Sequence, residues 1–174
     1  MTRDLVGDDT ALKTRVDTSR VKTIRQPQCT VEVISDSGEG AQKCGQTFGS
    51  VSAKMGNGVW TVEIIPAEIQ PPPRSPAGAS GNRIRLGEGV VTNWGDRTNV
   101  AIAFNEQVLL ARHRLDAIED GAILLVENMW ATHKDEDIRA EWTTAMEELG
   151  AANYRIIEVP MEQECLTIVD NARK

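Results

Sequence analysis

Four residues that could take part in chemistry, Ser37, Gly38, Glu39 and Gly40, follow a short β-branched run near the start of the chain. The glycines allow a tight turn, and the serine and glutamate supply a hydroxyl and a carboxylate. A segment with helical spacing comes next, so this stretch predicts a strand, a glycine turn and a helix. Ligands of α/β domains gather at the carboxyl ends of the strands. We therefore expect the function to be arranged around this turn.

The turn does not match the dinucleotide-binding fingerprint. That fingerprint, G-x-G-x-x-G, requires a third glycine where this sequence has Lys43. Glu39 would also place a negative charge against a pyrophosphate. Glu63, on a later predicted strand, could bind a ribose, but single acidic residues are common on strands. A phosphate- or nucleotide-binding turn and a turn that serves only the backbone both remain open.

The residues offer no self-sufficient catalytic set. Ser37 lies outside a G-x-S-x-G nucleophile motif. His113 and His133 are far apart and have no acidic partner in the sequence. The acidic residues at 135–137 suit the start of a helix, where the macrodipole favours negative charge, better than a metal site. A domain without its own chemistry often supports that of a partner.

The three cysteines, Cys29, Cys44 and Cys165, are odd in number, widely spaced and contain no C-x-x-C pair. A disulfide framework and a cysteine-held zinc or iron–sulfur site are therefore disfavoured. Buried free thiols in a reducing compartment fit this pattern better. We expect no metal bound by this chain.

Length and composition indicate one globular α/β domain. A chain of 174 residues, 40% of them hydrophobic, is long enough for a substantial core. The net charge of −7 argues against broad nucleic-acid binding, which requires a basic surface. The sequence has neither an apolar span long enough for a membrane helix nor a secretion signal. We expect a cytoplasmic protein that binds neither membranes nor nucleic acids.

Hydrophobic periodicity predicts the order of elements. The predicted strands are residues 29–34, 59–65, 99–104, 122–126 and 154–159, with a hairpin formed by 82–86 and 90–93. The predicted helices are residues 41–55, 106–115, 135–149 and one that begins near 161. We expect the second strand to follow the first by a parallel crossover and to lie next to it. The fold class is thus α/β, a Rossmann-like three-layer domain with a mostly parallel sheet and an inserted hairpin.

Side chains near the predicted helix ends supply caps. Asp36 or Ser37 is expected to cap the first helix, and Asp135 or Asp137 the third. Inside the first helix, Gly45 and Gly49 reduce helix propensity, so we expect them to permit close packing on the sheet. Asn105 follows a strand end and completes the group of polar residues expected at the carboxyl edge.

A long Pro/Gly-rich arm occupies residues 66–81. Loops of this length inside compact domains are usually functional, and proline stiffens part of this one. Arg74 and Ser75 are its candidate contact residues, because an arginine fork suits a phosphate or carboxylate. Residues 1–28 are expected to form an N-terminal arm or linker, and residues 29–174 the domain.

Several segments, taken in order, resemble the gamma domain of 2-oxoacid:ferredoxin oxidoreductases. They are EVISDSGEGA, WTVEIIPAEI, the arm leading into NRIRL, NVAIAFNE and GAILLV. The segments SDSGEG and PAEI are similar to the form fused at the front of the alpha subunit in 2-oxoglutarate-type enzymes. The resemblance covers residues 29–168. The sequence departs from it at 71–74, where PPPR replaces a glycine pair, and it ends at 171–174 where the family continues, so a natural subunit and a piece of a longer alpha subunit both remain open.

The resemblance implies a component of an enzyme that decarboxylates a 2-oxoacid, forms an acyl-CoA and reduces ferredoxin. Thiamine diphosphate, magnesium and [4Fe–4S] clusters are expected in partner domains or subunits. Coenzyme A is expected as a substrate. No catalytic residue is assigned to this chain. The candidate binding residues are Ser37, Gly38, Glu39, Gly40, Arg74, Ser75 and Asn105. The alternatives are a stand-alone phosphate- or nucleotide-binding module and a purely structural interaction domain.

Overall fold

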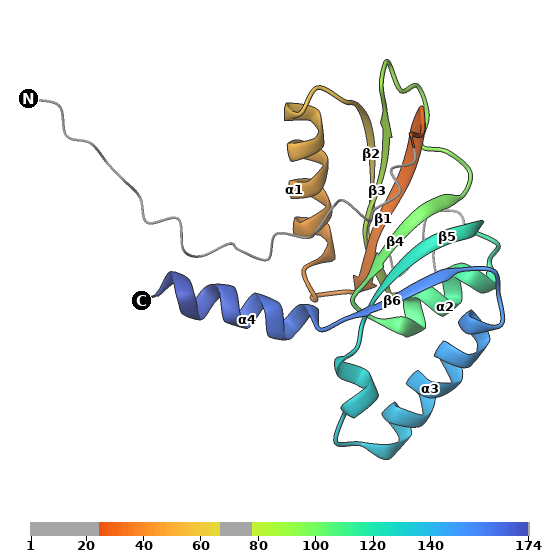
Figure 1. Ribbon diagram of the computed structural model, residues 1–174, viewed down its shortest axis with the longest axis vertical. Helices are drawn as coiled ribbons and strands as arrows, with labels where there is room; N and C mark the ends of the chain where they lie inside the picture. The colour runs from red at the N-terminus through yellow and green to blue at the C-terminus, as the bar shows by residue number, and fades with distance from the viewer. Residues whose placement is uncertain (1–24, 67–77, 174) are drawn as a thin grey trace, which may run out of the picture.

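The computed structural model describes residues 25–66 and 78–173. Its six strands form one sheet, in the order β2-β3-β1-β4-β5-β6 (Figure 1). The strands are β1 (Gln28–Asp36), β2 (Gly58–Ile64), β3 (Ala79–Gly87), β4 (Thr98–Ala103), β5 (Ile118–Glu127) and β6 (Arg155–Val159). The helices are α1 (Ala41–Lys54), α2 (Glu106–Arg114), the short 3-10 helix η2 (Met129–Thr132), α3 (Glu136–Gly150) and α4 (Met161–Ala172). The predicted α/β class and all five non-hairpin strands are confirmed.

Strand β3 is the one antiparallel strand of the described sheet. It pairs with β1 on one side and with β2 on the other, whereas β1, β4, β5 and β6 pair in parallel. The predicted hairpin is therefore wrong, since residues 90–93 form no strand. Both edges of β3 are already occupied, which leaves them no partner. The second strand also does not lie next to the first, because β3 separates them.

Helices cover the sheet in layers, as expected for a Rossmann-like domain (Figure 1). Helix α1 packs on β1, β2 and β3, and α2 packs on the opposite face with α3 beside it. The larger core cluster joins Ile34, Leu109, Leu124 and Leu149. A smaller cluster under α1 contains Val33, Ala41 and Ile84. Alternate residues of β1 thus face different helices, as the period of a strand requires.

Two glycines let α1 lie close to the sheet, as predicted. A Cβ added at Gly45 would stand 2.6 Å from Cβ of Asn82, and one at Gly49 would stand 3.2 Å from Cγ2 of Thr61. Both residues are buried against the sheet. The loss of helix propensity is therefore the cost of close helix–sheet packing.

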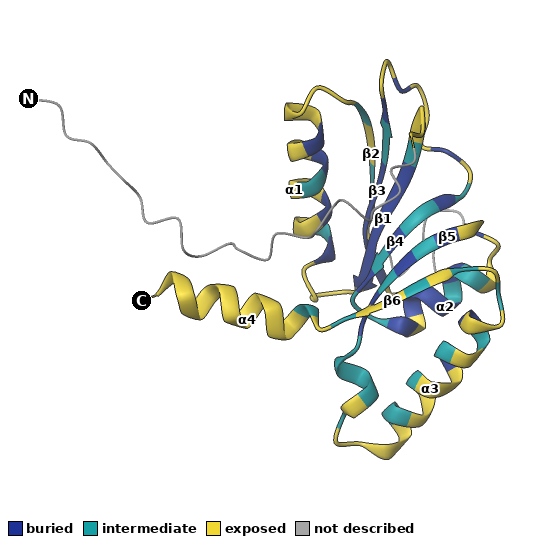
Figure 2. Cartoon of the chain, viewed as in Figure 1, coloured by how far each residue is buried: buried dark blue, intermediate teal, exposed yellow. Residues whose placement is uncertain are grey.

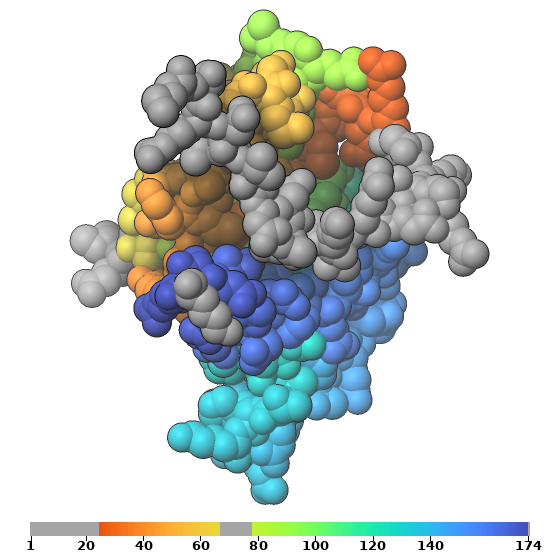
Figure 3. Space-filling view, turned by 60° about the vertical axis from the view of Figure 1, so that its left-hand side comes forward, coloured from red at the N-terminus to blue at the C-terminus, as the bar shows by residue number. Residues whose placement is uncertain are grey.

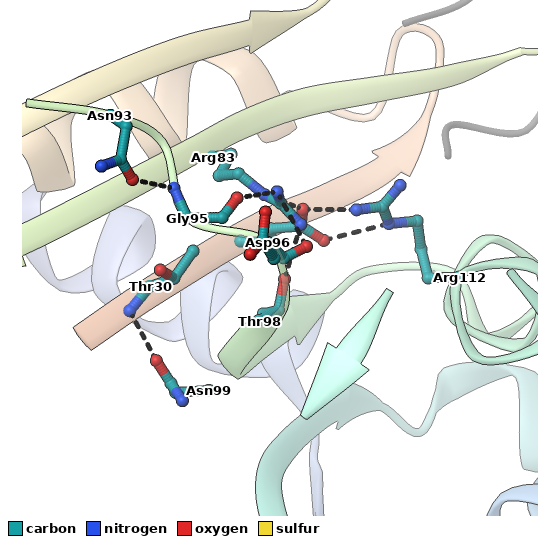
Figure 4. A network of polar contacts seen from close by, with 9 residues as sticks. Thr30, Arg83, Asn93, Gly95, Asp96, Thr98, Asn99 and Arg112 are labelled. Carbon is teal, nitrogen blue, oxygen red and sulfur yellow. Dashed lines mark hydrogen bonds and ion pairs between the residues drawn. The ribbon is translucent and has the colours of Figure 1, made fainter. Parts of the chain in front are cut away.

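A buried ionic triad fastens β1, β3 and α2 together (Figure 4). The Glu32 carboxylate accepts from Nε of Arg83 at 2.6 Å and from Nη2 and Nε of Arg112 at 2.6 and 3.1 Å. Arg83 also donates to the carbonyl oxygen of Gly95 at 2.8 Å. The side chains of Glu32, Arg83 and Arg112 are at most 10% exposed. The triad therefore ties the central strand to both its strand neighbour and its covering helix.

The cysteine prediction is wrong about burial. Cys29 on β1 is half-buried, while Cys44 and Cys165 are exposed, and all three are free thiols. Cys44 lies on the solvent side of α1, next to the buried Gly45. Cys165 lies on α4, which has no buried residue. The buried face of α1 is formed by Ala41, Gly45, Gly49 and Ser52, and α4 offers no buried face, so neither helix buries its cysteine.

Part of the predicted arm lies outside the described residues, including Arg74 and Ser75. Residues 79–81, which were assigned to the arm, belong instead to β3. Within residues 25–66 and 78–173, no helix is both long and apolar enough to cross a lipid bilayer.

Candidate functional site

A cavity of about 350 Å³ lies at the carboxyl edge of the sheet. The turn after β1, the ends of β4 and β5, η2 and the first turns of α4 surround it. Its lining residues are Glu39, Phe104, Glu127, Met129, Trp130, Met161, Glu162 and Cys165. Parallel strands bring their carboxyl ends to one edge, which is why residues distant in sequence meet here.

Glu39 of the glycine turn lines the cavity, and the turn begins α1 in a different way from the one predicted. Gly38 and Gly40 have φ values of +96° and +89°, the left-handed region that favours glycine. Gly40 is the N-cap of α1, and no side chain accepts from the first turn of the helix. The predicted cap by Asp36 or Ser37 is therefore wrong. Ser37 is exposed in the turn.

Glu39 folds back onto the end of β1. Its carboxylate accepts from the hydroxyl of Ser35 and from the backbone N–H of Asp36 at 3.3 Å. Partial burial raises the pKa of the Glu39 carboxyl above its usual value, and the nearby carboxylates of Asp36 and Glu106 add to this, while the Asp36 N–H opposes it. The turn is thus held by a carboxylate in an environment that disfavours its charge.

Because of this environment, the stability of the parent is expected to depend on pH differently from the stability of the Glu39→Gln variant. Because the pKa of Glu39 is raised in the folded state, the folded chain holds this proton more tightly than the unfolded chain does. The free energy of unfolding therefore falls as the pH rises from the unfolded-state pKa through the folded-state pKa. The glutamine side chain of the variant cannot ionise. We expect the Tm of the parent to fall relative to that of the variant as the pH rises above the usual pKa of a glutamate. Thermal melting followed by circular dichroism measures it. Glu119→Gln, at an exposed position of β5, is the control; a parallel profile for parent and Glu39→Gln would contradict the prediction.

Asn105 lies at the same edge of the sheet, and both polar atoms of its side-chain amide form hydrogen bonds within the domain. Its Oδ1 accepts from the backbone N–H of Gln107 at 2.8 Å and caps α2, and its Nδ2 donates to Oδ2 of Asp36 at 3.2 Å. Asn105 therefore connects the end of β1 to the start of α2. The structure brings together Asn105 and the turn at 37–40, whereas Arg74 and Ser75 lie outside the described residues.

Glu127 is a site residue that the sequence did not reveal. It ends β5 and is 3% exposed, and its two oxygens accept from the backbone N–H groups of Met129 at 3.0 Å and Glu162 at 2.8 Å. It thereby holds the starts of both η2 and α4 against the cavity. A carboxylate at a helix N-terminus is stabilised by the macrodipole. A Glu that directly follows an apolar strand run was the only sequence signal for it.

Trp130, a residue of η2, lines the cavity and contacts the residue that follows β4. Its indole N–H donates to the backbone carbonyl of Phe104 at 2.9 Å, so it anchors η2. Met129, Met161 and Cys165 add flexible or sulfur-containing apolar surface.

The arrangement suits an apolar group better than an anion. Carboxylates of Glu39, Glu127 and Glu162 line the cavity, and Asp36 lies behind the turn. A phosphate here would meet negative charge in a partly desolvated place. Within the described part of the chain, no three His, Cys, Asp or Glu side chains are grouped to hold a metal ion.

No protein-family model matches the sequence. A 103-residue stretch, 59% of this chain, is 31% identical to the 2-oxoglutarate oxidoreductase subunit KorA of Mycobacterium tuberculosis and covers 15% of that protein. Part of the 2-oxoglutarate:ferredoxin oxidoreductase of Magnetococcus marinus has the same fold, with a TM-score of 0.56 and 20% identity over 80% of this chain and 21% of that one.

Two solved subunits share the fold at lower identity. The pyruvate oxidoreductase subunit PORC of Thermotoga maritima has a TM-score of 0.50 and 18% identity, and covers 78% of this chain and 63% of that one. The gamma subunit of a keto/oxoacid ferredoxin oxidoreductase from Geobacter sulfurreducens has a TM-score of 0.50 and 14% identity, over 78% and 62%. This chain therefore spans less than two thirds of each of these relatives. The 31% identity to KorA over part of the chain and the fold shared with the solved structures agree with the resemblance to the gamma domain of 2-oxoacid:ferredoxin oxidoreductases.

Proposed function

We propose that this chain is the gamma component of a 2-oxoglutarate:ferredoxin oxidoreductase. In this reaction the 2-oxoacid loses CO₂, its acyl group joins the thiol of coenzyme A, and two electrons pass to ferredoxin. The observation that carries the proposal is the 31% identity to KorA over 103 residues, in a chain that folds as the solved relatives do. Its contribution is assembly with the catalytic domains and a border of the coenzyme A entrance.

The cofactors of such an enzyme would reside in its partners. The three cysteines of this chain lie on β1, α1 and α4, a distribution that does not suit a cluster held by four thiolates. We therefore assign thiamine diphosphate, magnesium and [4Fe–4S] clusters to other domains or subunits, through which the complex would reduce ferredoxin. The Magnetococcus relative is described with coenzyme A and succinyl-CoA bound, which supports coenzyme A as a substrate here. A cytoplasmic location remains part of this proposal.

A stand-alone phosphate- or nucleotide-binding module is the rival function. The glycine turn before α1 would favour it, because helix N-termini attract anions. The Glu39 carboxylate disfavours it, since it occupies the turn and accepts from the backbone N–H of Asp36.

Activity measurements on the purified chain and on the complex test the proposal. We expect no 2-oxoacid oxidation by this chain alone when thiamine diphosphate, magnesium, coenzyme A and an electron acceptor are added. Mixing it with the thiamine- and cluster-bearing subunits of the same organism should give a complex that reduces ferredoxin with 2-oxoglutarate. Turnover by the isolated chain, or no association with those subunits, would contradict the proposal.

A variant of Arg74 tests the proposed contact role of the candidate residues in the same assay. In the assembled enzyme, Arg74→Ala is expected to raise the KM for coenzyme A or to weaken assembly, because a guanidinium suits phosphate or carboxylate groups. Arg25→Ala is the matched control, since Arg25 is exposed before the start of β1 and pairs with Glu88. Ser75 is proposed to act with Arg74, and residues 37–40 and Asn105 to shape the edge from which the arm leaves. Unchanged assembly and unchanged acyl-CoA formation would leave Arg74 without this role.

A further inference from the structure

One face of the sheet is apolar but only partly covered. The pairing registers place Val33 of β1, Ile102 of β4, Leu125 of β5 and Ile157 of β6 in one row across the sheet. Burial decreases along this row, from Val33 at 0% exposed, through the half-buried Ile102 and Leu125, to Ile157 at 37% exposed. The helix above this face, α1, packs on β1, β2 and β3.

On the opposite face, covering is complete over β1, β4 and β5. Ile34, Ala103 and Val126 form the corresponding row under α2 and α3, and each is 0% exposed, while the β6 member of this row, Glu158, is exposed. Parallel strands of α/β proteins are normally buried on both faces. Figure 2 shows the change from buried colours at β1 to intermediate and exposed colours at β6. Within the described residues, the face over β4–β6 on the α1 side thus lacks the layer that this sheet type requires.

Helix α4 continues this apolar surface. Met161, Cys165, Ile168 and Val169 recur at helical spacing, and no residue of α4 is buried. Ile168 is 66% exposed and Val169 43% exposed. In Figure 3, α4 (dark blue) lies at the surface below α1 (orange). Met161 and Cys165 line the carboxyl-edge cavity together with Phe104 of the β4 end, so helix, cavity and sheet form one surface.

The charges of α4 and of the cavity indicate the occupant, and the basic residue Arg155 lies at the β6 edge of the surface, two residues before Ile157. Helix α4 contains the acidic residues Glu162, Glu164 and Asp170 and, from Met161 to Ala172, no Lys or Arg. Glu39 adds another carboxylate at the cavity. A second copy of this chain on α4 would oppose like charges, and an anionic lipid surface would be repelled in the same way. A protein segment with apolar anchors and flanking Lys or Arg residues is complementary.

We propose that Ile102, Phe104, Leu125 and Ile157 of the sheet, with Cys165, Ile168 and Val169 of α4, form the docking face for an apolar, basic-flanked segment of the thiamine- and cluster-bearing partner. This inference rests on the proposed function and specifies where the partner binds. Buried apolar anchors inside a ring of polar contacts dominate the affinity of such interfaces.

The experiment measures binding of the purified chain to those partner subunits by biolayer interferometry. Ile168→Glu and Ile157→Lys are expected to weaken binding at least tenfold. Their controls introduce the same groups at adjacent positions: Thr167→Glu on the opposite side of α4 and Glu158→Lys at the next residue of β6. The controls should bind as the parent does. Melting curves and size-exclusion chromatography of each isolated variant accompany the titration, and the parent Tm is expected because the substituted side chains are exposed.

Each outcome decides the inference. Parent-like affinity of both Ile168→Glu and Ile157→Lys would overturn the docking face while leaving the proposed function intact. Failure of the parent chain to bind would overturn both. A lowered Tm of isolated Ile168→Glu would show that α4 covers its own sheet, and a dimer that this substitution dissociates would show that a second copy is the occupant; either result overturns the proposal. Selective loss of partner binding at an unchanged Tm supports it.

Discussion

Glu32→Gln is expected to lower the free energy of unfolding by about 3–5 kcal/mol, because it leaves two buried guanidinium groups without their shared carboxylate. Glu32 is 1% exposed and accepts from both Arg83 and Arg112 at 2.6 Å. In a domain of this size, such a loss corresponds to a fall in Tm of roughly 6–20 °C. Urea denaturation followed by circular dichroism measures it. The substitution keeps the shape of the side chain, so the result reports on charge.

An exposed ion pair provides the control for this prediction. Arg114 of α2 donates to both carboxylate oxygens of Glu148 on α3 at 2.8 and 2.6 Å. This contact lowers the pKa of Glu148, yet water screens it, so Glu148→Gln should change stability little. Equal denaturation midpoints for Glu32→Gln and Glu148→Gln would show that the triad does not constrain the fold.

Gly81→Ala is expected to prevent normal pairing of β1 with β3 and to cost more than about 4 kcal/mol. A Cβ at position 81 would stand 1.9 Å from the carbonyl oxygen of Val33, and the φ of Gly81 is +157°. Val33 is 0% exposed at the centre of the sheet, so the backbone cannot easily move away. Soluble yield, the near-ultraviolet circular dichroism spectrum and the Tm of the variant measure the effect.

Gly89→Ala is the matched control, since a Cβ at Gly89 meets no atom within 4 Å. It lies in the loop after β3 and should melt as the parent does. A soluble Gly81→Ala variant with the Tm of the parent would contradict the described register of β1 and β3.

The sequence by itself determined most of the local elements and the resemblance to a family. Runs of β-branched residues predicted the strands, and Gly45 and Gly49 predicted a helix packed closely on the sheet. Asp135 was one of two predicted caps of α3, and its side chain accepts from the N–H of Asp137 at 3.0 Å. Periodicity, glycine positions and caps depend on neighbours in the chain, and so a single sequence contains this information.

The tertiary structure alone decided the order of the strands and the partners of the buried charges. Residues 82–86 were recognised as a strand, but alternation does not specify which edge a strand joins, and the turn at 87–89 wrongly predicted a hairpin. Glu32 looks like any charged strand residue until folding places Arg83 and Arg112, 51 and 80 residues away, against it. Likewise, α4 was predicted as a helix, yet its lack of buried residues follows only from what packs nearby. Pairing and burial depend on contacts between distant segments, which local propensity cannot specify.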